Sequence, residues 1–350
     1  MDHLNPHPDL YNVPFSTDKF NEMPYRQLGS SGLRASAVGL GAWKFGFPET
    51  GDQSRVNEKD SLAILDRAVK LGVTFWDTAN RYNNASGNSE RIIGRWFSAN
   101  PDQRRNIVLA TKVCGGMDGR TPNHGGLSRG CVLDSVYACL ARLQTPYIDL
   151  LYFHRFDDLV PIEESLTAVE DLVRRDLVRY LGVSNFSVEQ LEAYKAVGER
   201  MGTRCRIVAV QNRYDMLYGE TAAHRGALAW CAANGASLVA WGPLRQGLLT
   251  GRYLDPAKAG RGDRLFDEGA LAKEATPEVI AKVRALDALA RGWGMELSQL
   301  ALAYMLAQPG MGPVIPSASS PAQVESNARA ATACLSAQQL AQVSDAIKGK

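Results

Sequence analysis

The chain lacks the features that would direct it to a nucleic acid, a membrane or the cell exterior. Its 350 residues include 39 basic and 37 acidic side chains, a net charge of +2, and the basic residues form no cluster. This balance predicts no nucleic-acid partner. No apolar run is long enough to span a bilayer, and residues 1–24 are polar and interrupted by prolines, without an apolar signal segment. We therefore expect a cytoplasmic protein.

Cysteine and histidine are too few and too scattered to form a disulfide framework or a metal site. None of the six cysteines forms a C-x-x-C pair. In a chain of this length without a signal segment, they are predicted to be reduced thiols, mostly buried. The five histidines are dispersed, and two of them, His3 and His7, lie in the N-terminal extension. We expect no bound metal.

Short apolar strands alternate with amphipathic helices from about Leu28 to the end. This alternation predicts βαβ units and a parallel sheet, and eight strands fit a single (β/α)8 TIM barrel. An open doubly wound sheet would need a G-x-G-x-x-G turn after its first strand, which the run from Gly39 to Trp43 lacks. Strands are predicted at 37–40, 73–76, 106–111, 148–154, 178–183, 207–211, 237–241 and 314–315, and helices at 61–71, 129–143, 162–174, 187–199, 221–234, 277–292, 296–308 and 336–347.

We expect one domain over residues 25–350, preceded by an irregular extension over residues 1–24. The segment from Gly242 to Thr276 follows the seventh strand and is rich in Gly, Arg and Asp. Loops of this length in compact domains are usually functional or disordered. We interpret this one as an insertion over the mouth of the barrel.

Four ionisable side chains lie at or just past successive predicted strand ends. Asp77 ends the second strand, Lys112 the third and His154 the fourth, and Tyr82 follows shortly after Asp77. In a TIM barrel these ends share one rim, where active sites are built. Each residue alone has an ordinary explanation, such as a helix cap, a solvated charge, a core histidine or a loop anchor. Their co-occurrence favours a catalytic site.

The motifs occur in an order that resembles the aldo-keto reductase superfamily. The residues that carry this resemblance are DTANRY at 77–82, Lys112, His154, GVSNF at 182–186, QN at 211–212, WGPL at 241–244, GLLTGRY at 247–253, and the run from Ile315 to Gln323 with Asn327. The resemblance covers the chain from about Tyr25 to the last helix. The short tail after Asn327 is similar to that of the bacterial branch related to the potassium-channel β subunits.

The resemblance implies that a carbonyl and an alcohol are interconverted by hydride transfer, which needs an acid beside the developing alkoxide. A free tyrosine has a pKa of about 10, and a nearby ammonium lowers it. We therefore expect Tyr82 to be the proton donor, with Lys112 and Asp77 as the pair that tunes its pKa. His154 is expected to donate a hydrogen bond to the substrate oxygen. The same groups serve alcohol oxidation.

The resemblance also implies a nicotinamide cofactor. Ser184, Asn185 and Gln211 would bind its carboxamide, Trp241 would stack on the ring, and the loop from Gly242 would lie over the pyrophosphate. Pro321 near a helix start predicts an anion site there. The full set of predicted cofactor-binding residues is Gly41, Trp43, Asp77, Ser184, Asn185, Gln211, Trp241, Gly242, Pro243, Leu244, Gln246, Arg252, Arg264, Ser317, Ser319, Gln323 and Asn327.

Part of the usual NADP-binding motif is missing from this sequence. Relatives often carry Lys or Arg around the positions of Ser317, Ser319 and Gln323, where those side chains hold the 2′-phosphate. Gly242 also stands where a serine is common. Arginines of the long loop can replace the missing cations as bidentate phosphate binders, namely Arg252, Arg261 and Arg264. The sequence favours NADP(H) and leaves NAD(H) open.

The predicted activity is therefore that of a metal-independent carbonyl reductase, or NADP-dependent alcohol dehydrogenase, acting on a small aldehyde or ketone. Sugars, keto-sugars and polycyclic ketones are all compatible substrates, and an oligomer is compatible with the sequence. Three alternatives remain. The first is an NADPH-binding regulatory subunit with little turnover, and the second an NAD-dependent sugar or alcohol dehydrogenase. The third is a lyase or isomerase that uses Lys112 as a Schiff base.

Overall fold

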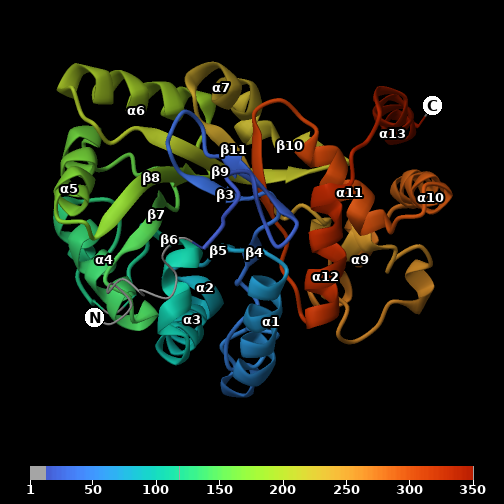
Figure 1. The fold of residues 1–350 in the computed structure, drawn as a ribbon, viewed down its shortest axis with the longest axis horizontal. Coiled ribbons are helices and arrows are strands. Elements are labelled where there is room, and N and C mark those ends of the chain that lie inside the picture. Colours follow the sequence, from blue (N-terminus) through green and yellow to red (C-terminus); the bar gives the residue numbers. More distant parts are fainter. Residues whose placement is uncertain (1–12, 118, 350) are drawn as a thin grey trace.

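Eight parallel strands form a barrel in the computed structural model, which describes residues 13–117 and 119–349 (Figure 1). Each strand pairs with the next along the chain, and the end strands meet where Gly39 N donates to Val314 O at 2.9 Å and Gly41 N to Pro316 O at 3.0 Å. The predicted single (β/α)8 barrel is confirmed. Its strands are β4 (Leu40–Gly41), β5 (Phe75–Asp77), β6 (Val108–Val113), β7 (Ile148–Phe153), β8 (Val178–Ser184), β9 (Ile207–Asp215), β11 (Ser237–Trp241) and β12 (Met311–Ile315).

Helices surround the barrel, and most of the longer ones bury one face against it. In α5, for example, Leu166, Val169 and Leu172 recur at three-residue spacing and are buried. No helix among the described residues is long and apolar enough to cross a membrane. The helices are α1 (Glu58–Lys70), α2 (Tyr82–Ala85), α3 (Asn88–Ala99), α4 (Arg129–Leu143), α5 (Ile162–Arg174), α6 (Val188–Met201), α7 (Ala227–Asn234), α8 (Arg264–Asp267), α9 (Leu271–Glu274), α10 (Pro277–Gly292), α11 (Leu297–Leu306), α12 (Pro321–Arg329) and α13 (Ala337–Lys348).

A small antiparallel sheet closes the amino-terminal end of the barrel. It consists of β1 (Lys19–Phe20), β2 (Met23–Gln27) and β3 (Arg34–Ser36). The turn after β2 lies against the start of β11, because Gly29 N donates to Ser237 Oγ at 2.8 Å. Leu28 and Ala35 join the core inside the barrel. The barrel therefore opens only at the carboxyl ends of its strands.

This sheet begins within the extension that the sequence predicts to be irregular. Residues 1–12 of that extension lie outside the described residues. Lys19–Phe20 pairs with the start of β2 through a turn in which Asn21 and Glu22 have φ of 47° and 64°. Such a turn usually carries Asn-Gly, so a glutamate at its second position hides it from sequence reasoning.

Most element boundaries differ from those predicted by a few residues, and three of the shifts have a clear physical reason. β6 continues to Val113, which pairs with Phe153, so Lys112 lies within the strand instead of after it. β9 extends to Asp215, whose neighbour Tyr214 pairs with the short strand β10 (Gly219–Glu220). The helix predicted from residue 221 begins at residue 227, because the Glu220 carboxylate accepts hydrogen bonds from two backbone N–H groups at its start.

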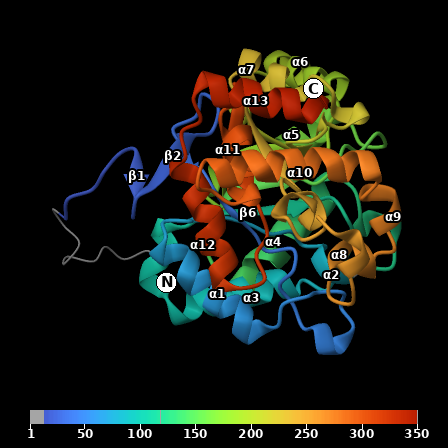
Figure 2. The same cartoon turned by 90° about the vertical axis from the view of Figure 1, so that its right-hand side faces the viewer.

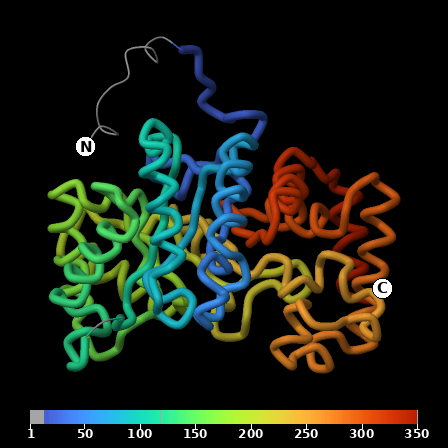
Figure 3. Tube along the Cα trace, turned by 90° about the horizontal axis from the view of Figure 1, so that it is seen from below, coloured from blue at the N-terminus to red at the C-terminus, as the bar shows by residue number. Residues whose placement is uncertain are grey.

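The long segment after β11 is an ordered structure with its own apolar core. It contains 3₁₀ turns at Arg245–Thr250 and Pro256–Lys258 and the short helices α8 and α9. Leu249, Tyr253 and Leu265 pack with residues of α10, α11 and α13 in a cluster separate from the main core. Figures 2 and 3 show this orange and red part of the chain gathered on one side of the barrel.

Candidate active site

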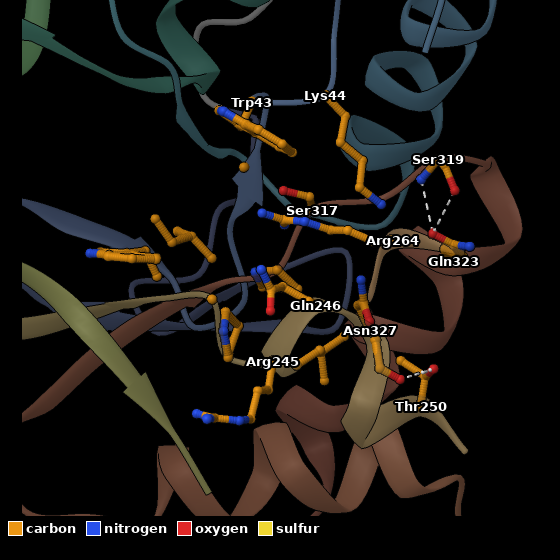
Figure 4. A pocket seen from close by; sticks show the side chains of 18 of the residues that line it. Trp43, Lys44, Arg245, Gln246, Thr250, Arg264, Ser317, Ser319, Gln323 and Asn327 are labelled. Atoms are coloured by element: carbon orange, nitrogen blue, oxygen red, sulfur yellow. Dashed lines mark hydrogen bonds between the residues drawn. The ribbon is translucent and has the colours of Figure 1, made fainter. Parts of the chain in front are cut away.

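A large cavity lies at the carboxyl ends of the barrel strands, where active sites of TIM barrels are found. Its volume is about 1280 Å³, and its walls come from strand ends, the loop after β11 and the region where α12 begins (Figure 4). Asp77, Tyr82 and His154 line it, and Lys112 is buried behind them. Every residue predicted from the sequence to bind the cofactor also lines this cavity.

Lys112, Asp77 and Tyr82 form one hydrogen-bonded group at the cavity wall. The Lys112 ammonium donates to Asp77 Oδ1 at 2.5 Å, to the Tyr82 hydroxyl at 2.6 Å and to the Thr78 carbonyl at 2.9 Å. The Tyr82 hydroxyl donates to Asp77 Oδ1 at 3.1 Å. Lys112 and Asp77 are each 1% exposed. A charge pair this deeply buried needs every donor satisfied, and all three ammonium donors are.

Asp77 is held from a second direction by Gln211 in β9. The Gln211 Nε2 donates to Asp77 Oδ2 at 2.7 Å, so both carboxylate oxygens accept hydrogen bonds. This fixes the carboxylate, and through it the ammonium of Lys112, against the hydroxyl of Tyr82. Gln211 was predicted to meet a cofactor carboxamide. It lines the cavity, but part of its hydrogen-bonding capacity is used within the protein.

Burial determines the protonation state of Tyr82. It raises the pKa of the phenol well above its ordinary value, and the negative charge of Asp77 raises it further. Burial lowers the pKa of Lys112, while Asp77 acts in the opposite direction. The net direction at Tyr82 is upward because desolvation disfavours the charged phenolate, and the lowering expected from the Lys112 ammonium stays a prediction. The phenol is protonated at neutral pH, which is the form that a proton donor needs.

His154 lies beside Tyr82 and is neutral. The two rings meet edge to face, with centroids 6.1 Å apart and an interplanar angle of 76°. Burial, together with the positive charges of Lys112, Arg155 and Arg81, lowers the pKa of His154 to about 3. A neutral imidazole carries a single N–H, so His154 can donate one hydrogen bond into the cavity.

The lowered pKa of His154 predicts a loss of stability in acid. The unfolded chain binds this proton with an ordinary pKa near 6.5, so the stabilisation is full above that pH and is lost as the pH falls toward 3. As the pH falls from about 7 to 4, the free energy of unfolding in urea should decrease in both proteins. We expect the decrease to be smaller in His154→Gln than in the wild type, by roughly 1–3 kcal/mol. Identical losses in the two proteins would contradict the burial of a neutral imidazole.

The residues expected to meet a carboxamide form a preorganised wall. Asn185 Nδ2 donates to Ser184 Oγ at 3.1 Å and to the His154 carbonyl at 3.0 Å. Trp241 Nε1 donates to Asn185 Oδ1 at 3.2 Å, which fixes the indole at the edge of the cavity. Asn185 has a φ of 59°, a left-handed conformation that asparagine tolerates better than most residues.

The loop after β11 is locked by one arginine and shaped by one glycine. Arg245 pairs with Asp215 at 2.8 Å and with Glu274 at 2.7 Å, which ties the loop to β9 and α9. Gly242 has a φ of 68°, and a Cβ built there meets no atom within 4 Å. Backbone conformation, not lack of space, therefore favours glycine where relatives often have serine.

The end of the cavity near α12 is neutral on one side and cationic on the other. Ser319 donates to Gln323 Oε1 from its backbone N at 2.9 Å and from its hydroxyl at 3.1 Å, and Ser320 caps α12. Arg252 and Arg264 line the cavity as predicted, and Arg264 lies over the Trp43 ring at 4.4 Å. Arg261, the third arginine considered for this role, is not among the lining residues.

Sequence reasoning missed several polar lining residues, because none of them belongs to the motifs that carry the resemblance. Glu296 precedes α11 and accepts hydrogen bonds from Ser326 at 2.5 Å and Ser298 at 3.4 Å. Lys44 follows Trp43, and only its position beside an expected cofactor residue could have suggested it. The missed residues include Lys44, Arg55, Arg245, Glu296, Ser298 and Ser326.

Comparison with known proteins agrees with this geometry. Residues 37–348 match the model of the aldo/keto reductase family. The chain is 35% identical over 309 residues to aldo-keto reductase AMT2 of Alternaria alternata, with 82% of each chain covered. It is 31% identical to a probable voltage-gated potassium channel subunit beta of Arabidopsis thaliana, covering 88% of this chain and 91% of the relative. It is also 31% identical to L-glyceraldehyde 3-phosphate reductase of Escherichia coli K12, covering 89% of each.

The match extends over nearly all of the barrel and includes the strand ends that carry Asp77, Lys112 and His154. One of these relatives is named as a probable potassium channel subunit beta, in agreement with the kinship expected from the short tail. On a barrel with this cavity, a family match of this extent identifies the chain as a member of the aldo/keto reductase family, whose members are oxidoreductases that act on carbonyl groups.

Proposed function

We propose that this protein is an NADP(H)-dependent oxidoreductase that reduces an aldehyde or ketone to an alcohol, with Tyr82 as the proton donor. The observation that carries the proposal is the buried group of Tyr82, Lys112 and Asp77, which meets the cavity beside a neutral His154. A protonated phenol next to a fixed ammonium is suited to giving up a proton to a developing alkoxide.

The chain's own residues account for the proton half of the reaction. When bound, the nicotinamide supplies the hydride that attacks the carbonyl carbon. His154 donates a hydrogen bond to the carbonyl oxygen and so orients it toward Tyr82. The Tyr82 hydroxyl, which donates to Asp77 in this structure, turns about its C–O bond and gives its proton to the alkoxide. The resulting phenolate lies 2.6 Å from the Lys112 ammonium, which stabilises its charge.

The cavity suits a dinucleotide in size and in the distribution of charge. Its volume of about 1280 Å³ exceeds what a small carbonyl compound needs. Ser184, Asn185 and Trp241 would hold the nicotinamide beside Tyr82, and the loop from Gly242 would lie along the pyrophosphate. Arg252 and Arg264 lie among the lining residues and favour a phosphorylated ligand.

The same cavity is compatible with several classes of carbonyl substrate. Sugars, keto-sugars, polycyclic ketones and small aldehydes can all present a carbonyl to Tyr82 and His154. An arrangement in which Lys112 forms a Schiff base is disfavoured, because its nitrogen already donates three hydrogen bonds and is paired with Asp77.

Titration of the purified protein with NADPH and with NADH, followed by protein fluorescence, tests this proposal. A panel of aldehydes and ketones is then added to each complex, and the loss of nicotinamide absorbance is measured. Binding accompanied by turnover supports the reductase. Tight binding without turnover on any carbonyl would favour a regulatory subunit instead, and a protein that binds neither dinucleotide would overturn the proposal altogether.

A further inference from the structure

Lys44 is a cation in the cavity without an acidic partner. It follows Trp43 just after β4, and its carbonyl accepts hydrogen bonds from Arg55 N at 2.9 Å and Val56 N at 3.0 Å, which fixes its backbone. Its side chain extends into the cavity toward the end lined by Ser319 and Gln323 (Figure 4). Within residues 13–117 and 119–349, its ammonium forms no ion pair.

The three arginines that share this part of the cavity are each neutralised. Arg55 pairs with Asp267 at 3.0 Å, Arg252 with Asp263 at 3.1 Å and Arg264 with Glu268 at 2.7 Å. Since each arginine has one carboxylate, the group as a whole keeps one excess positive charge, and Lys44 carries it. Arg252 and Arg264, which were predicted to replace the missing NADP contacts, therefore already form ion pairs within the protein, whereas Lys44 forms none among the described residues.

The surroundings of Lys44 are unfavourable for a lone ammonium. Burial, together with the positive charges of Arg264, Arg55 and Arg252, lowers its pKa to about 8. A half-buried lysine among other cations is destabilising unless an anion occupies the same space. The site is thus organised for a negatively charged group from a ligand, in the way that clustered cations bind phosphate.

The opposite wall identifies which phosphate fits. Ser317, Ser319 and Gln323 stand where relatives often carry the cations that hold a 2′-phosphate, and Ser319 and Gln323 are hydrogen-bonded to each other. We propose that Lys44 binds the 2′-phosphate of NADP(H) and so supplies, from the end of β4, the cation that the start of α12 lacks. This inference rests on the proposed function and adds to it a residue that determines cofactor specificity.

Direct binding measurements test the role of Lys44 without relying on turnover. Dissociation constants for NADPH and NADH are measured by calorimetry for the wild type, Lys44→Met and Lys44→Arg. Lys59→Met, which removes an exposed lysine of α1, serves as the matched control. Loss of a charge-assisted contact should raise the Kd for NADPH by about 10–100-fold in Lys44→Met. The Kd for NADH should change by less than about 2-fold, and Lys44→Arg should recover most of the NADPH affinity.

Adenosine 2′-monophosphate and adenosine 5′-monophosphate, used as competing probes, separate the two phosphate positions. Lys44→Met should weaken the 2′-phosphate probe and leave the 5′-phosphate probe unchanged. Equal weakening of NADPH and NADH would assign Lys44 to the pyrophosphate and overturn the inference while the proposed function stands. A wild type that prefers NADH, with the Glu296 carboxylate disfavouring the extra phosphate, would overturn it too. A wild type that binds neither dinucleotide would remove the proposed function itself.

The pH dependence of binding provides a second readout. The charged groups that face Lys44 are Arg264, Arg55 and Arg252 with their three carboxylate partners. Lys44 binds the phosphate in its protonated form. NADPH affinity should therefore fall as the pH rises through about 8. The same fall in Lys44→Met would show that another group is responsible.

Discussion

Tyr82→Phe is expected to lower kcat for carbonyl reduction by roughly 10²–10⁴-fold, because it removes the proton donor together with one acceptor of the Lys112 ammonium. The phenylalanine ring keeps the edge-to-face contact with His154, and Lys112 keeps its hydrogen bonds to Asp77 and the Thr78 carbonyl. Steady-state rates with a saturating aldehyde measure the loss. Calorimetric titration should show that the Kd for the nicotinamide cofactor changes by less than about 2-fold.

Tyr137→Phe is the matched control for this substitution. Tyr137 lies on α4 and is 42% exposed, so removing its hydroxyl should leave both kcat and binding unchanged. The raised pKa of Tyr82 adds a further check. Because the phenol stays protonated, the rate of reduction should show no decrease caused by deprotonation of Tyr82 between about pH 6 and 9. A Tyr82→Phe variant that retains its kcat would mean that another group delivers the proton.

Lys112→Met is expected to impair both stability and activity. It leaves the Asp77 carboxylate buried without its cationic partner, which should cost roughly 3–5 kcal/mol of unfolding free energy. It also removes the charge that stabilises the Tyr82 phenolate, so kcat of the folded protein should fall by about 10²–10³-fold. Urea unfolding and kinetics on the same preparations measure the two effects.

A second variant separates these two consequences. Lys112→Met combined with Asp77→Asn removes the unpaired charge, so stability should recover in part while kcat stays low. Arg104→Met is the matched control, because it breaks the buried pair of Arg104 and Asp149, 2.8 Å apart and outside the cavity lining. It should be destabilised with near-normal kcat. Full activity in the double variant would remove Lys112 and Asp77 from the mechanism.

The sequence could predict which side chains gather at the candidate site because parallel strands bring their carboxyl ends to one rim. Asp77 and His154 directly end or follow buried strands, and that position alone places them on the same rim. What a strand end does not reveal is protonation. The pKa values of Tyr82 and His154 depend on how completely the assembled barrel buries them, and burial outweighs the nearby ammonium of Lys112 at the phenol.

Residues outside strand-end motifs could not be predicted in the same way. Lys44 resembles an ordinary solvated lysine in the sequence, and its isolation becomes visible only when Arg55, Arg252 and Arg264 are seen paired with other residues. Glu296 reaches the cavity from the start of α11, far along the chain from any catalytic motif. Contacts of this kind depend on packing between distant segments, which local pattern does not specify.

The apolar cluster beneath the segment after β11 is expected to unfold as a unit of its own. Leu249, Tyr253 and Leu265 are buried with α10 and α13 and not with the barrel, so amide hydrogen exchange should detect their opening separately from global unfolding. A dinucleotide held between this unit and the strand ends would have to leave through its opening. The lifetime of the closed state, set by that small core and by the ion pairs of Arg245, would then limit how fast product cofactor departs.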